Sequence, residues 1–330
     1  MNRTNSSAVF NGFDKLPDAA HYIFGVVYIV LNVIATTGNI LVLFVFIKSP
    51  KLRSAHCFLV SALCFGDLLM SSVGLTMLII ASFSTYWVLG KMACTFYGTL
   101  MTFLGLSQIT LLAVIAYTRY LVVVHNNGIG TISAKVIVLA CYTYSLCFSL
   151  APLFGWSTFA LEPIGTSCGP NWVGITLDDI SFNMTLFFLC FLVPLSVILF
   201  SYSMVYKKIK KRKIRKKSEG YEIHVTTTIL FMIVAFLGSW TPYACMALYI
   251  VITRNNRINL VVSAIPLLLA KCSPVWNPYI YFMRNHKFNQ ECRKLLPFLK
   301  HLGLWRVNPR EQNVVTQQQV TSSTRTSTYV

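Results

Sequence analysis

The sequence predicts an all-α membrane protein, a bundle of seven transmembrane helices. Hydrophobic residues make up 55% of the 330 residues and charged residues only 12%, about half the charged fraction of a soluble domain. The mean hydropathy is +0.62. Seven stretches exceed the ~20 apolar residues that a helix needs to cross a hydrocarbon core. None alternates in polarity as the strands of a membrane barrel do.

Five of the seven stretches contain no charged residue and no histidine. They are Tyr22–Ile47, Met92–Tyr117, Val136–Leu161, Ile180–Tyr206 and Val225–Thr253. The other two are Ala55–Trp87, with His56 at its edge and Asp67 inside, and Ile258–Met283, with Lys271 inside. The chain therefore divides into an N-terminal segment 1–21, a seven-helix domain 22–283, a short helix 284–296 and a tail 297–330.

The distribution of Lys and Arg predicts the orientation in the membrane. A strongly basic run, 207–217, separates the fifth and sixth stretches, whereas the loop 156–179 has neither Lys nor Arg. Because basic loops stay in the cytosol, we expect a multi-pass plasma-membrane protein with an extracellular N-terminus. The net charge of +18 comes mainly from this cytosolic rim and does not require a nucleic acid as partner.

The two ends of the chain carry weaker signals. Asn2 and Asn5 each begin an Asn-X-Ser/Thr glycosylation sequon. No cleavable signal peptide is evident, so the first helix is expected to direct membrane insertion. After the seventh stretch, apolar residues fall on one side of an amphipathic helix that is expected to rest on the inner leaflet. Cys292 on this helix is a candidate for palmitoylation, and the polar tail that follows is predicted to be disordered.

Lys271 and Asp67 are the charged residues expected within the membrane. Lys271 lies near the middle of its stretch, where a charged lysine costs ~2.5–3.5 kcal/mol. A desolvated amine can condense with an aldehyde to form a Schiff base; the alternative is an ion pair or a lysine in a water-filled cavity. Asp67 lines a water or ion path, forms part of a polar network with Asn39 and Asn277, or has a purely structural role.

Cys94 and Cys168 are predicted to form a disulfide. Cys94 opens the third stretch at its outer end, and Cys168 lies in the outer loop before the fifth, in a compartment that favours oxidation. The bond would fasten this loop over the mouth of the bundle. Glu162 is the acid near the disulfide; it either enters a buried site or remains an ordinary solvated carboxylate.

Several motifs together resemble the rhodopsin-like family of G-protein-coupled receptors over residues 22–296. They are Gly38-Asn39, Leu63 with Asp67, Arg119-Tyr120, Trp240-Thr241-Pro242-Tyr243 and Asn277-Pro278-Tyr279-Ile280-Tyr281. Within that family the chain resembles the opsins, whose retinal lysine stands six residues before the Asn-Pro pair, as Lys271 does here. The resemblance implies a retinal chromophore, 11-cis or all-trans, as a Schiff base on Lys271, in a pocket lined by Trp240, Tyr243 and Phe236.

A protonated Schiff base needs a nearby anion. Vertebrate visual opsins place a Glu three residues after the third-helix cysteine, where this chain has Tyr97. The second opsin carboxylate site, six residues before the loop cysteine, is Glu162, which the resemblance therefore implies as counterion. This arrangement resembles bistable, non-visual opsins, with an unprotonated, ultraviolet-absorbing Schiff base as the alternative. The sequence around Cys168 and Lys271 looks closest to the neuropsin group.

The resemblance also implies a switch for a heterotrimeric G protein at the cytosolic end. The acid that usually precedes the third-helix arginine is Thr118 here, so Arg119 would be restrained by Glu222 alone. Light would then shift the population of states, with the sixth helix swinging about Pro242. Arg119 and Tyr281 would meet the G protein in the cleft that opens.

Two other functions remain open beside light-driven signalling, and a transporter or channel is disfavoured. A retinal photoisomerase would use the same lysine without signalling, and Thr118 is compatible with that; a receptor for a diffusible ligand would make Lys271 coincidental. We expect neither an enzyme nor a metal site. The Ser- and Thr-rich tail suggests a receptor kinase and an arrestin as partners, and the ending Thr328-Tyr329-Val330 suggests a PDZ domain.

Overall fold

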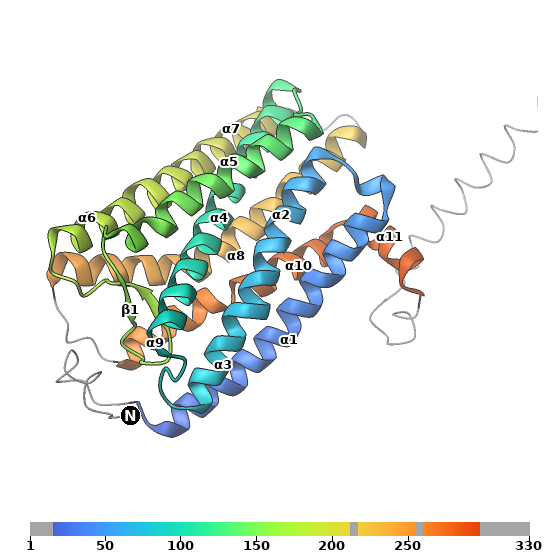
Figure 1. The fold of residues 1–330 in the computed structure, drawn as a ribbon. Coiled ribbons are helices and arrows are strands. Elements are labelled where there is room, and N and C mark those ends of the chain that lie inside the picture. Colours follow the sequence, from blue (N-terminus) through green and yellow to red (C-terminus); the bar gives the residue numbers. More distant parts are fainter. Residues whose placement is uncertain (1–15, 212–216, 255–259, 298–330) are drawn as a thin grey trace, which may run out of the picture. The chain divides into compact units, whose positions relative to one another are not determined.

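The structure, a computed structural model, describes residues 16–211, 217–254 and 260–297. Residues 16–285 form one compact unit, a bundle of helices packed side by side (Figure 1). The elements of this bundle are α1 (Asp18–Lys48), η1 (Pro50–Leu52), α2 (Ala55–Leu69), η2 (Met70–Leu75), α3 (Thr76–Phe83), α4 (Gly90–His125), α5 (Thr131–Leu150), η3 (Ala151–Phe154), β1 (Phe159–Leu161), β2 (Cys168–Pro170), α6 (Leu177–Thr185), η4 (Leu186–Leu192), α7 (Val193–Lys211), α8 (Lys217–Thr253), α9 (Leu260–Lys271) and α10 (Ser273–Arg284). The second unit contains α11 (His286–Leu295).

Seven membrane crossings are present, as the sequence predicts. Within the described ranges, six continuous helical runs are long and apolar enough to span a membrane. The seventh crossing is made of α9 and α10, which are separated by a turn at Cys272. Pro274 stands in the first turn of α10, where its missing N–H costs no helical hydrogen bond.

The fourth crossing ends earlier than expected. The prediction that it runs to Leu161 is wrong, because α5 and the tight turn η3 end at Phe154. Gly155 follows with a φ of 95°, a left-handed conformation that terminates helices. The last three residues of the predicted stretch form β1 instead, which pairs antiparallel with β2.

Two crossings contain a π-helical segment that the sequence pattern did not predict. In η2 the widened turn frees backbone carbonyls, and the hydroxyls of Ser71 and Ser72 both donate to the carbonyl of Leu68, at 3.1 and 2.6 Å. Side-chain hydroxyls of this kind satisfy backbone groups that lipid leaves without water. A second π-helical segment, η4, interrupts the fifth crossing.

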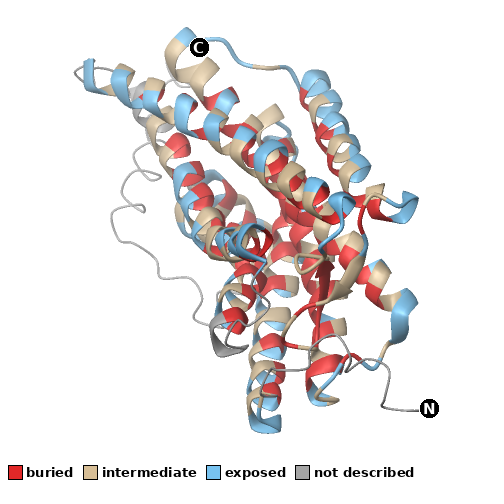
Figure 2. Cartoon of the chain, turned by 90° about the vertical axis from the view of Figure 1, so that its left-hand side faces the viewer, coloured by how far each residue is buried: buried red, intermediate tan, exposed pale blue. Residues whose placement is uncertain are grey.

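Large apolar side chains cover much of the outer surface of the bundle, and the apolar core also contains buried polar residues. Buried residues concentrate between the helices, whereas exposed residues face outward (Figure 2). Large apolar side chains such as Ile23, Val33 and Val136 are 60% or more exposed. Such a surface suits hydrocarbon rather than water.

Candidate functional site

A cavity inside the bundle contains the ε-amine of Lys271. Its lining is mostly apolar and comes from α4, β2, the fifth crossing, α8 and α9. The lining residues include Met101, Gly105, Glu162, Pro170, Trp172, Phe187, Cys190, Phe236, Trp240, Tyr243, Leu267, Ala270 and Lys271. Apolar lining with a few convergent polar groups is typical of a small-molecule site.

Lys271 is the last residue of α9 and is 5% exposed. Its Nζ lies 5.3 Å from the centroid of the Tyr97 ring, within the range of a cation–π contact. Tyr97 is fully buried and stacks obliquely on Trp87, with the ring centroids 5.4 Å apart. The lysine predicted as chromophore site therefore lies against the residue that occupies the visual-opsin counterion position.

Glu162 enters the same cavity from the loop between β1 and β2. It is 5% exposed, and its main-chain N–H donates to the carbonyl of Ser167 at 2.9 Å. One carboxylate oxygen accepts a 2.5 Å hydrogen bond from the hydroxyl of Tyr243, and the other accepts one from the hydroxyl of Ser167. The indole N–H of Trp172 donates to the Tyr243 hydroxyl at 3.0 Å. The carboxylate is thus oriented by hydroxyl groups while it faces the cavity that holds Lys271.

The expected disulfide between Cys94 and Cys168 is present. It joins the outer end of α4 to β2 and so brings the hairpin, with Glu162, under the mouth of the bundle. The hairpin also approaches α4 closely at Gly98, where an added Cβ would lie 2.5 Å from a ring carbon of Phe159.

We expect Gly98→Ala to destabilise this arrangement by about 1–3 kcal/mol, the usual cost of overpacking a core. The clash would push Phe159, and with it the strand that leads to Glu162. Thermal unfolding of the purified protein measures the effect. Gly238→Ala is the matched control, because nothing lies within 4 Å of a Cβ at that position; equal melting temperatures for the two variants would contradict the prediction.

Aromatic residues of α8 form one wall of the cavity. Phe236 stacks on Trp240 with centroids 5.9 Å apart, and Trp240 packs edge-on against Tyr243 at 6.1 Å. Gly105 on α4 allows this packing, since a Cβ there would come within 3.0 Å of the indole. The three predicted pocket residues of α8 therefore lie together, and any change of shape in the cavity acts directly on this helix.

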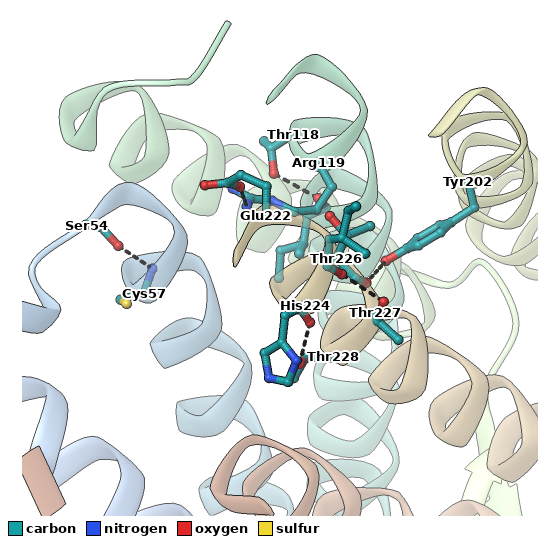
Figure 3. A network of polar contacts seen from close by, with 12 residues as sticks. Ser54, Cys57, Thr118, Arg119, Tyr202, Glu222, His224, Thr226, Thr227 and Thr228 are labelled. Carbon is teal, nitrogen blue, oxygen red and sulfur yellow. Dashed lines mark hydrogen bonds and ion pairs between the residues drawn. The ribbon is translucent and has the colours of Figure 1, made fainter. Parts of the chain in front are cut away.

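At the end of the bundle opposite the disulfide, Arg119 and Glu222 form an ion pair between α4 and α8, with a distance of 3.2 Å (Figure 3). Thr118 does not take part, because its hydroxyl donates to the carbonyl of Ile115 on its own helix. Tyr120 lies elsewhere, with its hydroxyl 2.8 Å from His125 Nε2. The arginine thus pairs with the acid of the sixth crossing, in the arrangement the sequence suggests.

Asp67 is the centre of a buried polar network. Its carboxylate accepts hydrogen bonds from Asn277 at 2.7 Å and from Gln108 at 3.0 Å. Asn39 donates to the carbonyl of Pro274 rather than to Asp67. Tyr281, which follows the kink residue Pro278 on α10, packs edge-on against Phe46 at 5.4 Å. The network therefore joins the second, third and seventh crossings, and Asn39 contacts it only through α10.

Some of the predicted functional residues are not part of this cavity or of the contacts described above. Asn2, Asn5 and the tail residues 298–330 lie outside the described residues. Cys292 is buried on α11, and burial raises the pKa of its thiol to about 11. Palmitoylation of Cys292 stays a prediction.

Sequence reasoning missed three residues that shape the site: Ser167, Trp172 and Gln108. Ser167 directly precedes the disulfide cysteine, and a buried amide such as Gln108 in an apolar stretch is itself a signal of a polar partner. Nothing in the sequence pattern points to Trp172, because its contact with Tyr243 depends on how the loop folds back.

Comparisons with known proteins agree with this fold. The family described as seven-transmembrane receptors of the rhodopsin family matches residues 38–281. Opsin-VA of Rutilus rutilus is 32% identical over 276 residues, covering 81% of this chain and 72% of the relative. Parapinopsin of Ictalurus punctatus is 31% identical and covers 83% and 81%. Melanopsin of Phodopus sungorus is 30% identical, and the chain spans 64% of its length.

The fold is also that of a solved structure. The crystal structure of squid rhodopsin superposes with a TM-score of 0.83, covers 91% of each chain and is 23% identical in sequence.

Proposed function

This chain belongs to the rhodopsin family of seven-transmembrane receptors, and within it to the opsins, which are light-sensing G-protein-coupled receptors. On that basis we propose that Lys271 carries retinal as a Schiff base, with Glu162 as its counterion. The observation that carries the proposal is the burial of one amine and one carboxylate on the same apolar cavity. We further propose that the N-terminus is extracellular and that the receptor works in the plasma membrane.

The residues of the cavity suit a long apolar aldehyde. Lys271 supplies an amine for the aldehyde carbon, and the aromatic wall of Trp240, Phe236 and Phe187 suits a conjugated chain. Bound retinal would supply light absorption and a change of shape by isomerisation. The proposal includes both 11-cis and all-trans retinal, and the nucleotide-exchange experiment below tests each isomer.

Glu162 is suited to hold a positive charge on the Lys271 nitrogen. Its two hydroxyl donors, Tyr243 and Ser167, hold the carboxylate oxygens in place at the cavity. A buried cation without such an anion is costly. The carboxylate would therefore keep the proton on the linkage and the absorption in the visible range.

Helix α8 couples the cavity to the cytosolic end of the bundle. Trp240 and Tyr243 face the cavity from α8, and Glu222 on the same helix pairs with Arg119 at the cytosolic end. A ligand that favours a different packing of Trp240 shifts the population toward a state in which this pair is broken. Opening there would expose Arg119 to a heterotrimeric G protein, followed by a receptor kinase and an arrestin at the tail, with a PDZ protein at the C-terminus.

The test is light-dependent nucleotide exchange on purified G proteins by receptor loaded with 11-cis or all-trans retinal. We expect illumination to raise exchange by about tenfold or more, the usual range of allosteric coupling. Arg119→Gln should retain the pigment but lose exchange.

The second candidate is a retinal photoisomerase, which Thr118 favours because the usual acid beside Arg119 is missing. Release of isomerised retinal under light, without exchange on any G protein class, would establish that function in place of signalling.

A further inference from the structure

A second contact holds the cytosolic part of α8, on the side facing α10. His224 lies two residues after Glu222, and its Nε2 is 2.5 Å from the main-chain carbonyl oxygen of Arg284. A carbonyl only accepts, so this ring nitrogen carries the proton. Arg284 is the last residue of α10, and the last carbonyls of a helix lack a donor within the helix. His224 therefore caps the end of α10 from the neighbouring helix.

The side chain of Arg284 also contacts α8, on the face that carries His224. Its Nε donates to the hydroxyl of Thr228 at 3.4 Å, and its guanidinium carbon lies 4.6 Å from the centroid of the Phe231 ring. The Thr228 hydroxyl in turn donates to the main-chain carbonyl of His224 at 2.9 Å. Backbone and side chain of one residue are thus engaged by three residues on successive turns of α8. Figure 3 shows His224 and Thr228 on the same part of α8 that carries Glu222.

This contact and the Arg119–Glu222 pair join α8 to different neighbours. The ion pair connects α8 with α4, and the capping contact connects α8 with α10. Glu222 remains 38% exposed, and water weakens an ion pair at such exposure. Thr228 is only 4% exposed, so its hydrogen bonds compete less with water.

We propose that His224 and Thr228 form a latch with Arg284 that holds α8 against α10 in the dark, in addition to the Arg119–Glu222 pair. The latch rests on the proposed signalling function, because an outward swing of α8 has to break it. Arg284 follows Tyr281 by three residues on α10, so a rearrangement of the Asn-Pro-x-x-Tyr segment moves the latch as well. His224 and Thr228 are positioning residues in this scheme. Thr118 stands where the family has an acid beside the arginine, and a second restraint on α8 would compensate for that missing carboxylate.

The experiment removes each half of the latch and measures two properties in the dark. His224→Phe keeps a ring but removes the donor, and Thr228→Val keeps the shape but removes the hydroxyl. Thr227→Val is the matched control, because the Thr227 hydroxyl donates only along its own helix, to the carbonyl of Ile223. The readouts are hydrogen–deuterium exchange of residues 222–231 and G-protein nucleotide exchange without light.

We expect both latch variants to raise dark nucleotide exchange and the amide exchange of this segment by about fivefold, the typical effect of one lost hydrogen bond, and the control to change neither. His224→Gln retains an N–H donor, so it should raise both exchange rates less than His224→Phe does. In combination with Glu222→Gln the two increases should multiply, because the restraints act on different neighbours. Unchanged amide exchange in both variants would refute the latch.

The two readouts separate the latch from signalling itself. If no variant, nor the native receptor under light, activates a G protein, the proposed function fails, while hydrogen exchange still decides on the latch. If light activates the native receptor and the latch variants match the control in both readouts, only the latch is wrong.

Discussion

Lys271→Ala is expected to abolish pigment formation entirely. The variant has no amine in the cavity to condense with the aldehyde, so incubation with 11-cis or all-trans retinal should give no light-sensitive band. Absorption spectra of the purified protein, before and after illumination, measure this. Trapping with borohydride followed by peptide mapping should place the chromophore of the native protein on residue 271.

The control for this prediction separates charge from chemistry. Lys271→Arg retains a cation beside Tyr97 and Glu162 but cannot condense with an aldehyde at neutral pH. Lys271→Arg should have a melting temperature similar to that of the native protein and still form no pigment. A light-sensitive band in either variant would show that the chromophore is held elsewhere, and a folded native protein that binds neither isomer would favour the receptor for a diffusible ligand.

Glu162→Gln is expected to lower the visible absorbance at pH 7 by about tenfold or more, with a matching gain in the ultraviolet. An adjacent anion favours the charged form of a basic group by about one to three pK units. Without it the nitrogen on Lys271 holds its proton less tightly and is neutral at pH 7. The visible band should therefore return as the pH is lowered, and it should not return as the pH is raised.

Two conditions sharpen the measurement. The buffer contains sulfate as its only anion, so that chloride does not replace the missing carboxylate. Asp178→Asn removes the same charge from an exposed position in the first turn of α6 and should leave the spectrum unchanged. A visible band that persists at pH 7 in Glu162→Gln would exclude this residue as counterion and direct attention to Asp67 and Asp179, which are also buried.

The sequence by itself determined the number of crossings, the central lysine and the disulfide. Crossing a membrane requires long apolar stretches whatever their neighbours do, so composition along the chain was sufficient to place seven helices. A charge such as Lys271 is conspicuous against that background. Cys94 and Cys168 were paired because both lie on the outer side, and the arginine of the third crossing was matched to Glu222 through the motifs of a known family.

The tertiary structure alone decided where the fourth crossing ends, which turns are π-helical and which groups hold Glu162. A hydropathy pattern does not distinguish the helix from the strand that begins at Phe159, because apolar residues suit either structure when the loop packs on the bundle. Tyr243 lies 81 residues after Glu162 in the chain, and Arg284 lies 60 residues after His224. Ser167 and Trp172 are closer to Glu162 in sequence, but their contacts depend on how the loop folds back. Hydrogen bonds between such residues depend on angles and distances set by packing, and no spacing within the sequence encodes them.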